Sequence, residues 1–558
     1  MEAHAPIGRW GHSAHGLDAR TRAFAELVLG PASSAPMPTM QAVAPAREPG
    51  CAWGHVAPGV RIDATDEVRA AHSRGMSYLD LLAWRGANGA SGALLPAVDA
   101  VAFPTSHEQA LAVVQGCASE GVVVVPVGGG TSVTGGIDAG AGAATSGDDR
   151  PVLAVSLAEL DALTHLDTES HIATVQAGMT GPQVEQALDG YTLGHFPQSW
   201  ERATIGGFIA ARSSGQSSGG YGRIEDMLIG ATLAPPAGTW KVGGYPAASM
   251  GPDLRHVVLG SEGTLGVITS AQLRVRPMPS VREYAAAIVP LPRTERGAGL
   301  SADPSFAPAS DVARALTRSP LRPTVLRVSD AGETQALLTM SAPAGIAGSL
   351  FNAYVRARRA LPGALVIVGW EGNDPGTVGA ARAFARSVIG DAGGVWLGSG
   401  PGRSWERGRF HGPYLRDELM DAGYLVETFE TVVRWSELAE LHATLRDVAR
   451  RALGDASYVM AHISHTYETG ASIYFTVLAG GWSDPAAAAQ RWRAAKQTIT
   501  KAMVRAGGAL SHHHGIGRDH APWLEENIGP IGVQVLEGIR TAVDPSGVMN
   551  PSVLRAVT

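Results

Sequence analysis

The alternation of apolar and polar positions predicts strands and helices from about residue 99 onward. The apolar run Val122–Val125 predicts a buried strand, and Pro126 is expected to end its hydrogen-bonding ladder. Before it, the capping box Ser-His-Glu-Gln opens a predicted helix over residues 106–117. Leu153–Ser156 and Ile172–Gln176 are further predicted strands. Residues from about 99 to 176 are therefore predicted to form a small layer of strands and helices.

A second small layer is expected after the first. The sequence Thr-Gly-Pro-Gln from Thr180 caps a predicted helix that runs to about Leu188. A strand pair is predicted at Val267–Thr269 and Leu273–Val275. Two α/β layers of this kind can sandwich an extended ligand.

The pattern changes after Pro277. Residues 290–322 are rich in Pro, Ser, Ala and Arg, which predicts a mobile connection. Beyond it, predicted strands such as Leu365–Val368 and Ile473–Val477 alternate with Ala- and Arg-rich helices such as Leu438–Leu453. This second alternation indicates a separate domain.

The valine strand ends at a stack of glycines, Gly128-Gly129-Gly130. Glycine adopts backbone angles closed to other residues, and consecutive N–H groups in such a turn can hold an anion, usually a phosphate. Thr131 and Ser132 add hydroxyl donors. Three glycines alone are equally compatible with a tight turn that binds nothing. The pattern is neither G-x-G-x-x-G nor G-x-x-x-x-G-K-[ST], which argues against a Rossmann site and a P-loop.

Composition narrows the class of protein. A chain of 558 residues with 45% apolar and 17% charged residues is typical of a soluble globular protein of two or more domains. A net charge of −7 without a basic block argues against nucleic-acid binding. Cys51 and Cys117 are the only cysteines, so we expect neither disulfides nor Cys-based zinc sites. With no long apolar stretch, secretion signal or C-terminal S-K-L, a cytoplasmic setting is expected.

Three further segments, taken together with the glycine turn, point to one protein superfamily. They are GHFPQSWERATIGG at residues 194–207 (continuing to ARSSG), GSEGTLGVIT at 260–269 and DPSGVMNP at 544–551. In this order they resemble the FAD-linked oxidase superfamily of the vanillyl-alcohol-oxidase type. The resemblance covers roughly residues 95–558.

Within that superfamily the chain is most similar to the alkyl-dihydroxyacetone-phosphate synthase family. The similarity is carried by SHTYETGASIYF at residues 464–475, SHHHGIG at 511–517, YLRD at 414–417, VLRVSD at 325–330 and RWG at 9–11. The eukaryotic synthase carries a peroxisomal address that this sequence does not show, which leaves the physiological substrate open.

The resemblance implies an α+β fold. A two-subdomain FAD-binding domain of the vanillyl-alcohol-oxidase (PCMH) type would be followed by an α/β cap domain for the substrate. We expect an N-terminal arm over residues 1–95, the FAD-binding domain over 96–278, the cap over 279–505, and a C-terminal segment over 506–558 that returns to the flavin site.

The resemblance also implies a set of FAD-binding residues. Pro126–Ser132 would hold the pyrophosphate, and three other segments would line the isoalloxazine and ribityl portions. The full set is Pro126, Val127, Gly128, Gly129, Gly130, Thr131, Ser132, Gln198, Ser199, Trp200, Glu201, Arg202, Ala203, Thr204, Ala211, Arg212, Ser213, Ser214, Glu262, Gly263, Thr264, Leu265, Gly266, Val267 and Ile268. Covalent members of the superfamily attach flavin through His or Cys, and the loop has neither, so we expect non-covalent FAD.

Three residues match the family's catalytic and substrate-binding positions. Tyr474 stands where the synthase has its general acid/base tyrosine. A free phenol has a pKa near about 10, so a neighbouring cation would have to lower it. Arg416, at the substrate-binding position, can grip a phosphate or carboxylate bidentately, and Arg327 matches another required arginine. Without the resemblance, surface arginines and a core tyrosine would be the better interpretation.

His512, His513 and His514 form the remaining candidate cluster. In an extended chain they would alternate faces, so at most two would address one site. They can orient the base, stabilise an enediolate or bind a metal. Metal binding usually needs a further, separate ligand, so we predict no metal site.

The leading functional hypothesis is a flavoenzyme of the synthase type. It would exchange the acyl group of an acyl-dihydroxyacetone phosphate for a fatty alcohol, without net redox change. The alternative is an FAD-dependent 2-hydroxy-acid dehydrogenase, although such enzymes carry Glu where this chain has His513. A non-enzymatic flavin-binding role is third. The expected partners are the lipid substrate or a 2-hydroxy acid, a second copy in a homodimer, and a membrane touched peripherally.

Overall fold

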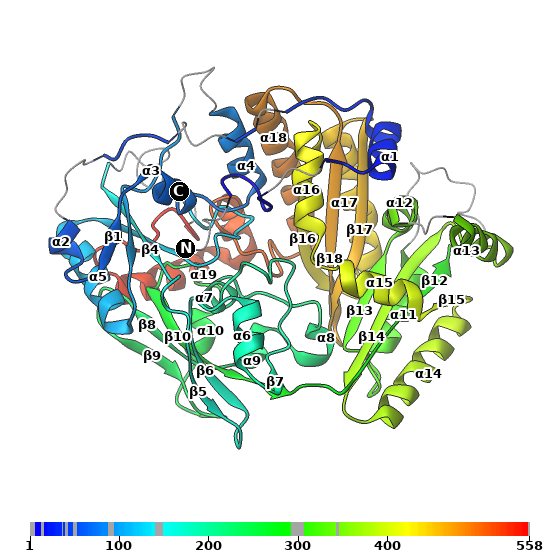
Figure 1. Cartoon of the computed structure of the whole chain (residues 1–558), viewed down its shortest axis with the longest axis horizontal. Helices are drawn as coiled ribbons and strands as arrows, with labels where there is room; N and C mark the ends of the chain where they lie inside the picture. The colour runs from blue at the N-terminus through cyan, green and yellow to red at the C-terminus, as the bar shows by residue number, and fades with distance from the viewer. Residues whose placement is uncertain are drawn as a thin grey trace.

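The computed structural model describes residues 6–12, 16–35, 37–38, 43–47, 53–87, 94–139, 149–291, 306–341 and 345–555. Within these ranges, two small sheets lie on one side of the molecule and a large sheet on the other (Figure 1). Helices cover the sheets, so the fold is of the mixed α+β class that the resemblance implies.

Within the described ranges, the first sheet has four strands in the order β1-β2-β4-β3. They are β1 (Arg61–Asp63), β2 (Ala100–Phe103), β3 (Val123–Val127) and β4 (Val152–Ser156). The crossover helix α5 (His107–Glu120) begins as predicted, because the Ser106 hydroxyl accepts the N–H of Gln109. The Gln109 side chain accepts from Thr105 rather than Ser106, so the reciprocal half of the capping box is absent. The helix ends at Gly121, whose φ is 69°.

The ladder of β3 continues past Pro126, contrary to the sequence prediction. Pro126 and Val127 stay in parallel register with β4. β3 is the edge strand, and on its outer side the N–H of Val124 donates to the carbonyl of Val548 at 2.9 Å. Pro126 lies two residues after Val124 and faces the same outer side, so its missing N–H costs no bond to β4.

The second sheet, drawn from residues 149–291, has five antiparallel strands in the order β5-β6-β10-β8-β9. They are β5 (Leu163–Asp167), β6 (Ile172–Gln176), β8 (Leu228–Ala234), β9 (Trp240–Gly243) and β10 (Val267–Arg274). The predicted strand pair at residues 267–275 is wrong, because β10 is one strand. Its register against β8 shifts twice, around the polar residues Ser270 and Gln272. These irregularities interrupt the apolar pattern without ending the strand. The predicted helix at Thr180 is α6 (Gly181–Ala187).

The third sheet has seven antiparallel strands within residues 281–291, 306–341 and 345–555, in the order β15-β12-β14-β13-β17-β18-β16. They are β12 (Val281–Pro290), β13 (Val325–Ser329), β14 (Gly363–Gly372), β15 (Val395–Gly398), β16 (Leu425–Arg434), β17 (Ser457–Thr466) and β18 (Gly470–Ala479). The predicted helix 438–453 is α17 (Leu438–Leu453), which buries Leu441 and Leu445. Other helices around this sheet are α12 (Ala331–Ser341), α13 (Gly345–Ala357), α14 (Pro375–Asp391), α15 (Ser399–Gly408), α16 (Gly412–Asp421) and α18 (Pro485–Arg505).

The predicted mobile connection over residues 290–322 contains a packed helix, which corrects the sequence prediction. α11 (Ala307–Thr317) buries Val312, Ala313 and Leu316. Its proline lies in the first turn, where a missing N–H breaks no helical bond. The prediction weighed composition and missed this apolar face, while residues 292–305 lie outside the described residues.

The N-terminal residues contact both halves of the molecule. α1 (Ala19–Leu29) packs against the large sheet, where the rings of Phe24 and Tyr458 lie 5.4 Å apart (Figure 1). α4 (Tyr78–Gly86) packs on α18, with Tyr78 against Trp492 at 6.1 Å. α2 (Trp53–Val56) and α3 (Asp66–Ala71) flank β1, so part of the predicted arm completes the first sheet.

The C-terminal segment lies along the edge strand β3 of the first sheet. After the 3₁₀ turn Ala521–Trp523 and α19 (Leu524–Val543), Met549 bridges to Val124 of β3. The remaining short elements are α7 (Ile205–Ala210), α8 (Ser218–Tyr221), α9 (Ile224–Met227), α10 (Arg255–Val258), β7 (Tyr191–Thr192) and β11 (Arg276–Pro277). Among the described helices, none combines the length and apolar character that crossing a bilayer requires.

Candidate active site

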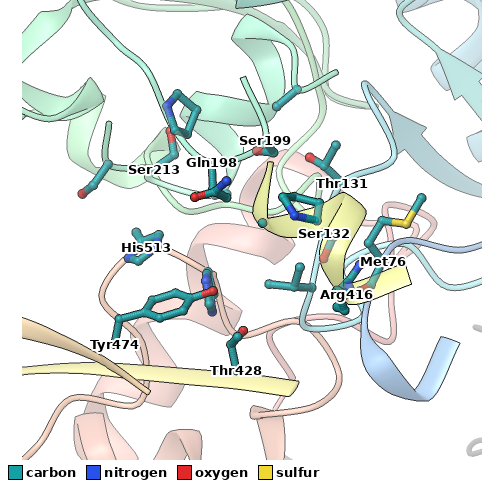
Figure 2. A pocket seen from close by; sticks show the side chains of 18 of the residues that line it. Met76, Thr131, Ser132, Gln198, Ser199, Ser213, Arg416, Thr428, Tyr474 and His513 are labelled. Carbon is teal, nitrogen blue, oxygen red and sulfur yellow. Dashed lines mark hydrogen bonds between the residues drawn. The ribbon is translucent and has the colours of Figure 1, made fainter. Parts of the chain in front are cut away.

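A cavity of about 490 Å³ lies between the glycine turn after β3 and the large sheet. Strands β13, β16, β17 and β18 contribute its second wall, together with the loop at residues 511–517. Figure 2 shows one wall with Thr131, Ser132, Gln198, Ser199 and Ser213, and the facing wall with Thr428, Tyr474 and His513. Most of the segments with a sequence motif therefore meet in one place, whereas residues 544–551 line no part of the cavity and pair with β3 through Met549.

The glycine turn lines the cavity, and its three glycines serve different purposes. A Cβ on Gly129 would stand 1.8 Å from the carbonyl oxygen of Arg202, and one on Gly128 would stand 2.3 Å from Thr204 Oγ1. These two glycines let residues 202–204 pack directly on the turn. Gly130 alone of the three has a positive φ, 67°, and its Cβ direction is open.

Most of the predicted cofactor residues line the cavity. Side chains with hydroxyl or amide groups alternate on this wall with glycines and small or apolar residues. Those that line it are Pro126, Gly128, Gly129, Gly130, Thr131, Ser132, Gln198, Ser199, Ala203, Thr204, Ala211, Ser213, Ser214, Glu262, Gly263, Gly266 and Ile268. Those that do not are Val127, Trp200, Glu201, Arg202, Arg212, Thr264, Leu265 and Val267.

The residues at 200–202 face other parts of the chain instead. The Trp200 ring stacks on Phe410 at 5.2 Å, and Glu201 accepts the Tyr414 hydroxyl at 2.9 Å. The Arg202 guanidinium lies 4.9 Å from the ring of Trp10. This stretch is a turn, and its three consecutive side chains point away from the cavity.

Tyr474 lines the opposite wall, on β18. Its ring stacks on His462 at 5.1 Å and on His513 at 6.1 Å, and His514 meets it edge-on at 5.4 Å. Burial raises the pKa of Tyr474 to about 12, although Arg416 opposes the rise. The expectation that a cation lowers this pKa is therefore not met in the free protein, because loss of hydration outweighs the guanidinium.

The three histidines wrap around one buried carboxylate. The backbone N–H groups of His512, His513 and His514 all donate to Glu430, at 2.9 to 3.1 Å. The hydroxyl of Ser511 donates to the same carboxylate at 2.8 Å. The loop is thus curled, not extended. His513 and His514 line the cavity and His512 does not, which agrees with the prediction that at most two of them address one site.

The titratable groups of this loop differ in their ionisation at neutral pH. Although burial opposes ionisation, the neighbouring His513 ring holds the pKa of Glu430 well below its usual range. Burial lowers the pKa of His514 to about 3, so this imidazole is neutral at neutral pH. His512 turns away from the cavity, where its Nε2 lies 2.5 Å from the Tyr467 hydroxyl and its Nδ1 lies 3.0 Å from His513 Nδ1.

Arg327 reaches the cavity edge from β13, but it is not a free cation. It donates to Glu333 at 2.9 Å, and its Nη2 lies 3.1 Å from Nδ1 of His462. Burial notwithstanding, His462 and Arg327 lower the pKa of Glu333 to about 2. Because His462 stacks on Tyr474, Arg327 fixes the surroundings of that phenol.

Arg416 enters the cavity from α16. Its Nη1 donates to the carbonyl of Met76 at 3.1 Å, and its Nε is buried without a partner. No described carboxylate forms an ion pair with it. Glu427 and Asp417 both feel the charge of Arg416, and burial raises the pKa of both carboxyls, that of Glu427 to about 7. Arg416 therefore has capacity left for an anion (Figure 2).

Comparison with known proteins places this geometry in a family. Residues 98–243 match the family described as FAD binding domain, and residues 293–554 match FAD linked oxidases, C-terminal domain. Alkyldihydroxyacetonephosphate synthase of Dictyostelium discoideum is 30% identical over 495 residues, which cover 87% of this chain and 76% of that protein. The chain belongs to the alkyldihydroxyacetonephosphate synthase family.

Solved structures agree with this assignment. A structure of alkyldihydroxyacetonephosphate synthase superposes with a TM-score of 0.79 at 26% identity, and 98% of each chain is covered. The structure of p-cresol methylhydroxylase with bound substrate has a TM-score of 0.64 at 14% identity, covering 89% of this chain and 94% of that one. The second likeness shows a shared fold alone. The predicted fold class is confirmed by both structures and the family matches, and the family resemblance is confirmed by the synthase relatives.

As a member of the synthase family, the chain is an FAD-dependent enzyme. The cavity wall fits that cofactor. Gly130 has open space in its Cβ direction, and the hydroxyls of Thr131, Ser132 and Ser199 line the same wall. Bare backbone and hydroxyl donors suit phosphate oxygens and flavin carbonyls.

Sequence reasoning missed four buried titratable residues beside this site, namely Glu333, Glu427, Glu430 and His462. Glu427 and Glu430 both interrupt the apolar strand β16, and a carboxylate inside such a strand was the available signal. His462 precedes the quoted motif at 464–475 by two positions. Its link to Glu333 crosses two elements and has no sequence signal.

Glu430→Gln should loosen the histidine loop. Four donors lose an ionised acceptor, which should cost on the order of 3 kcal/mol in free energy of unfolding. A carboxylate with a lowered folded pKa stabilises the protein above its unfolded pKa, near 4.5, and loses this effect as the pH falls. Urea unfolding should thus show a large difference between parent and variant at pH 7 that shrinks below about pH 4.5. A difference independent of pH would contradict the assigned charge.

Proposed function

We propose that the protein exchanges the acyl group of an acyl-dihydroxyacetone phosphate for a fatty alcohol, without net redox change. One observation carries this proposal: the cavity combines a guanidinium without a described carboxylate partner with an apolar branch. Arg416 supplies the guanidinium. The apolar branch is lined by Phe24, Ala336, Met340, Met460 and Leu478.

The apolar branch suits a long hydrocarbon chain. It lies between α1, α12 and the strands β17 and β18 of the large sheet. Each methylene transferred into such a branch gains about 0.8 kcal/mol. A short 2-hydroxy acid has no use for this volume, so the branch favours the synthase function over the dehydrogenase alternative.

The polar end of the cavity would position the headgroup. Arg416 would grip the phosphate, and Tyr474 would move the proton at C1 of the substrate. Bound FAD would supply an electron sink for this chemistry. His513 and His514 line the cavity next to Tyr474, where they can stabilise negative charge on the substrate oxygen. Arg327 would act through His462, by fixing the ring that stacks on Tyr474.

Anaerobic mixing of the purified holoprotein with two kinds of substrate tests the proposal. Palmitoyl-dihydroxyacetone phosphate with a fatty alcohol should release fatty acid without any electron acceptor. D-2-hydroxy acids should leave the oxidised flavin band unchanged. Bleaching of that band together with ketoacid formation would instead establish the dehydrogenase function.

Arg416→Lys should weaken substrate binding more than FAD binding. Lysine keeps the charge but loses the planar fork that holds two phosphate oxygens. We expect KM for the phosphorylated ketone to rise by about tenfold or more, with an unchanged FAD spectrum. Arg434→Lys, at the exposed end of β16, is the matched control and should leave KM unchanged. Equal kinetics on phosphorylated and dephosphorylated substrates would show that Arg416 is no phosphate clamp.

Three finer assignments belong to the same proposal. FAD would be held without a covalent bond, since residues 126–132 contain neither His nor Cys. Trichloroacetic acid should therefore release all the flavin from the protein. A homodimer and peripheral membrane contact are proposed from the family resemblance and from the lipid nature of the substrate. The cytoplasmic location expected from the sequence stays a prediction. Light scattering tests the homodimer, and vesicle flotation tests the membrane contact.

A further inference from the structure

A second cavity, of about 580 Å³, lies at the boundary between the two halves of the molecule. The half with the two small sheets contributes residues 218–223, Asp226 and the strand ends at Arg274 and Arg276. The large-sheet half contributes residues near Arg322 and the hairpin at 466–468. Four arginines line this space, and none of them belongs to the active-site cavity.

Two of these arginines are held side by side without an ion pair, although the Glu371 carboxylate, which accepts the Tyr221 hydroxyl, acts on Arg276 electrostatically. Arg274 and Arg276 both donate to the carbonyl oxygen of Tyr221, at 3.4 and 3.1 Å. The Arg276 guanidinium also lies 4.2 Å from the Tyr221 ring centroid, and its Nε is buried without a partner. No carboxylate of the described residues forms an ion pair with either guanidinium. Two like charges fixed at one oxygen repel each other, and burial together with Arg274 lowers the pKa of Arg276.

The other charged groups of the cavity do not cancel this pair. Arg322 is exposed and has no ion pair with a described carboxylate. Arg223 is already committed, because it binds Glu225 and donates to the carbonyl of His512. The two acidic lining residues, Asp226 and Glu468, are solvent-exposed. Asp226 also accepts the backbone N–H of Arg223. Arg274 and Arg322 are exposed as well, and Arg276 is the half-buried arginine without an ion pair to a described carboxylate. With four arginines against two carboxylates, the lining of the cavity is net cationic.

We propose that this cavity binds a small oxyanion of at least two negative charges, of the phosphorylated or polycarboxylate class. The ligand would lie between Arg274 and Arg276 of one half and Arg322 of the other. Arginine forks match phosphate and carboxylate oxygens, and an anion at this point relieves the repulsion between the paired guanidiniums.

The location connects the ligand to the back of the histidine loop. Tyr467 and Arg223 line the second cavity, and both contact His512 from that side. His512 in turn contacts His513, which lines the active site. An anion in the second cavity would therefore lie beside Tyr467 and Arg223, which contact the histidine loop, without entering the active-site cavity. The proposal does not depend on the substrate assigned above.

Isothermal titration of the FAD-loaded protein with pyrophosphate tests the site. We expect a binding event at the second cavity in addition to anion binding at Arg416, and Arg276→Gln should weaken this event by about tenfold or more. Because Arg276 also packs on Tyr221, the exposed Arg322→Gln serves as a second variant that leaves the packing intact. Separate titrations with inorganic phosphate and citrate distinguish a monophosphate and a polycarboxylate from a diphosphate.

Arg416→Gln is the matched control, since it removes the cation of the other cavity. Pyrophosphate affinity that survives in this variant and falls in both Arg276→Gln and Arg322→Gln supports the site. Loss of all pyrophosphate binding in Arg416→Gln would place the anion in the active site and overturn the proposal. Absence of heat at millimolar concentrations of all three anions, or affinity unchanged in Arg276→Gln and Arg322→Gln, would also overturn it.

Discussion

Tyr474→Phe is expected to lower turnover by about 100- to 10,000-fold while FAD content and fold stay unchanged. The substitution removes one hydroxyl, and the ring can still stack on His462 and His513. What disappears is the hydroxyl of a residue that lines the cavity, the group that we propose moves the substrate proton. Since burial raises its pKa to about 12, the parent phenol is protonated in the free enzyme across neutral pH. Removal of a substrate proton therefore requires the complex to lower that pKa.

Fatty-acid release, the visible flavin spectrum and a thermal melt measure the three parts of this prediction. Tyr458→Phe is the matched control. Tyr458 is also largely buried on the large sheet, but its hydroxyl donates to the carbonyl of Gly332 at 2.9 Å and lies outside the cavity. It should cost about 1 kcal/mol of stability and leave turnover unchanged. Activity of Tyr474→Phe within a few-fold of the parent would remove this residue from the mechanism and direct attention to the histidine loop.

Gly129→Val is expected to yield protein without FAD. The new Cβ would stand 1.8 Å from the Arg202 carbonyl oxygen, so the turn and residues 202–204 cannot both keep their places. Backbone atoms on both sides leave no flexible neighbour to move. The clash should cost on the order of 4 kcal/mol or more. FAD would be lost because the two segments of the cavity wall can no longer pack together, not because the valine side chain would occupy the position of the phosphate.

Flavin absorbance per protein and urea unfolding test this prediction. Gly129→Ala should already show the defect, because the clash involves Cβ itself. Gly379→Val, in the middle of α14 with open space around its Cβ direction, is the control and should retain full FAD. Normal flavin occupancy in Gly129→Val would mean that the packing of residues 202–204 on the turn is not needed for the cofactor.

Local patterns in the sequence were sufficient for many single elements. The helix 438–453 and the strand 172–176 have the predicted bounds, because their apolar periodicity and their ends are properties of a few neighbouring residues. Predictions failed where a remote segment changed the meaning of a local signal. Pro126 continues its ladder because the position of its missing N–H faces away from the partner strand β4, and the Pro-rich connection contains α11, whose apolar face meets the large sheet.

The candidate site divides in the same way. The order of motifs along the chain determined the family, the FAD and the residues Tyr474, Arg416 and His512–His514, since each motif is contiguous in sequence. Only the tertiary structure decided which of them share one cavity, that Glu430 holds the histidine loop, and that Arg327 is paired with Glu333. Hydrogen bonds and desolvation depend on distances in space between remote residues. No local pattern encodes those distances.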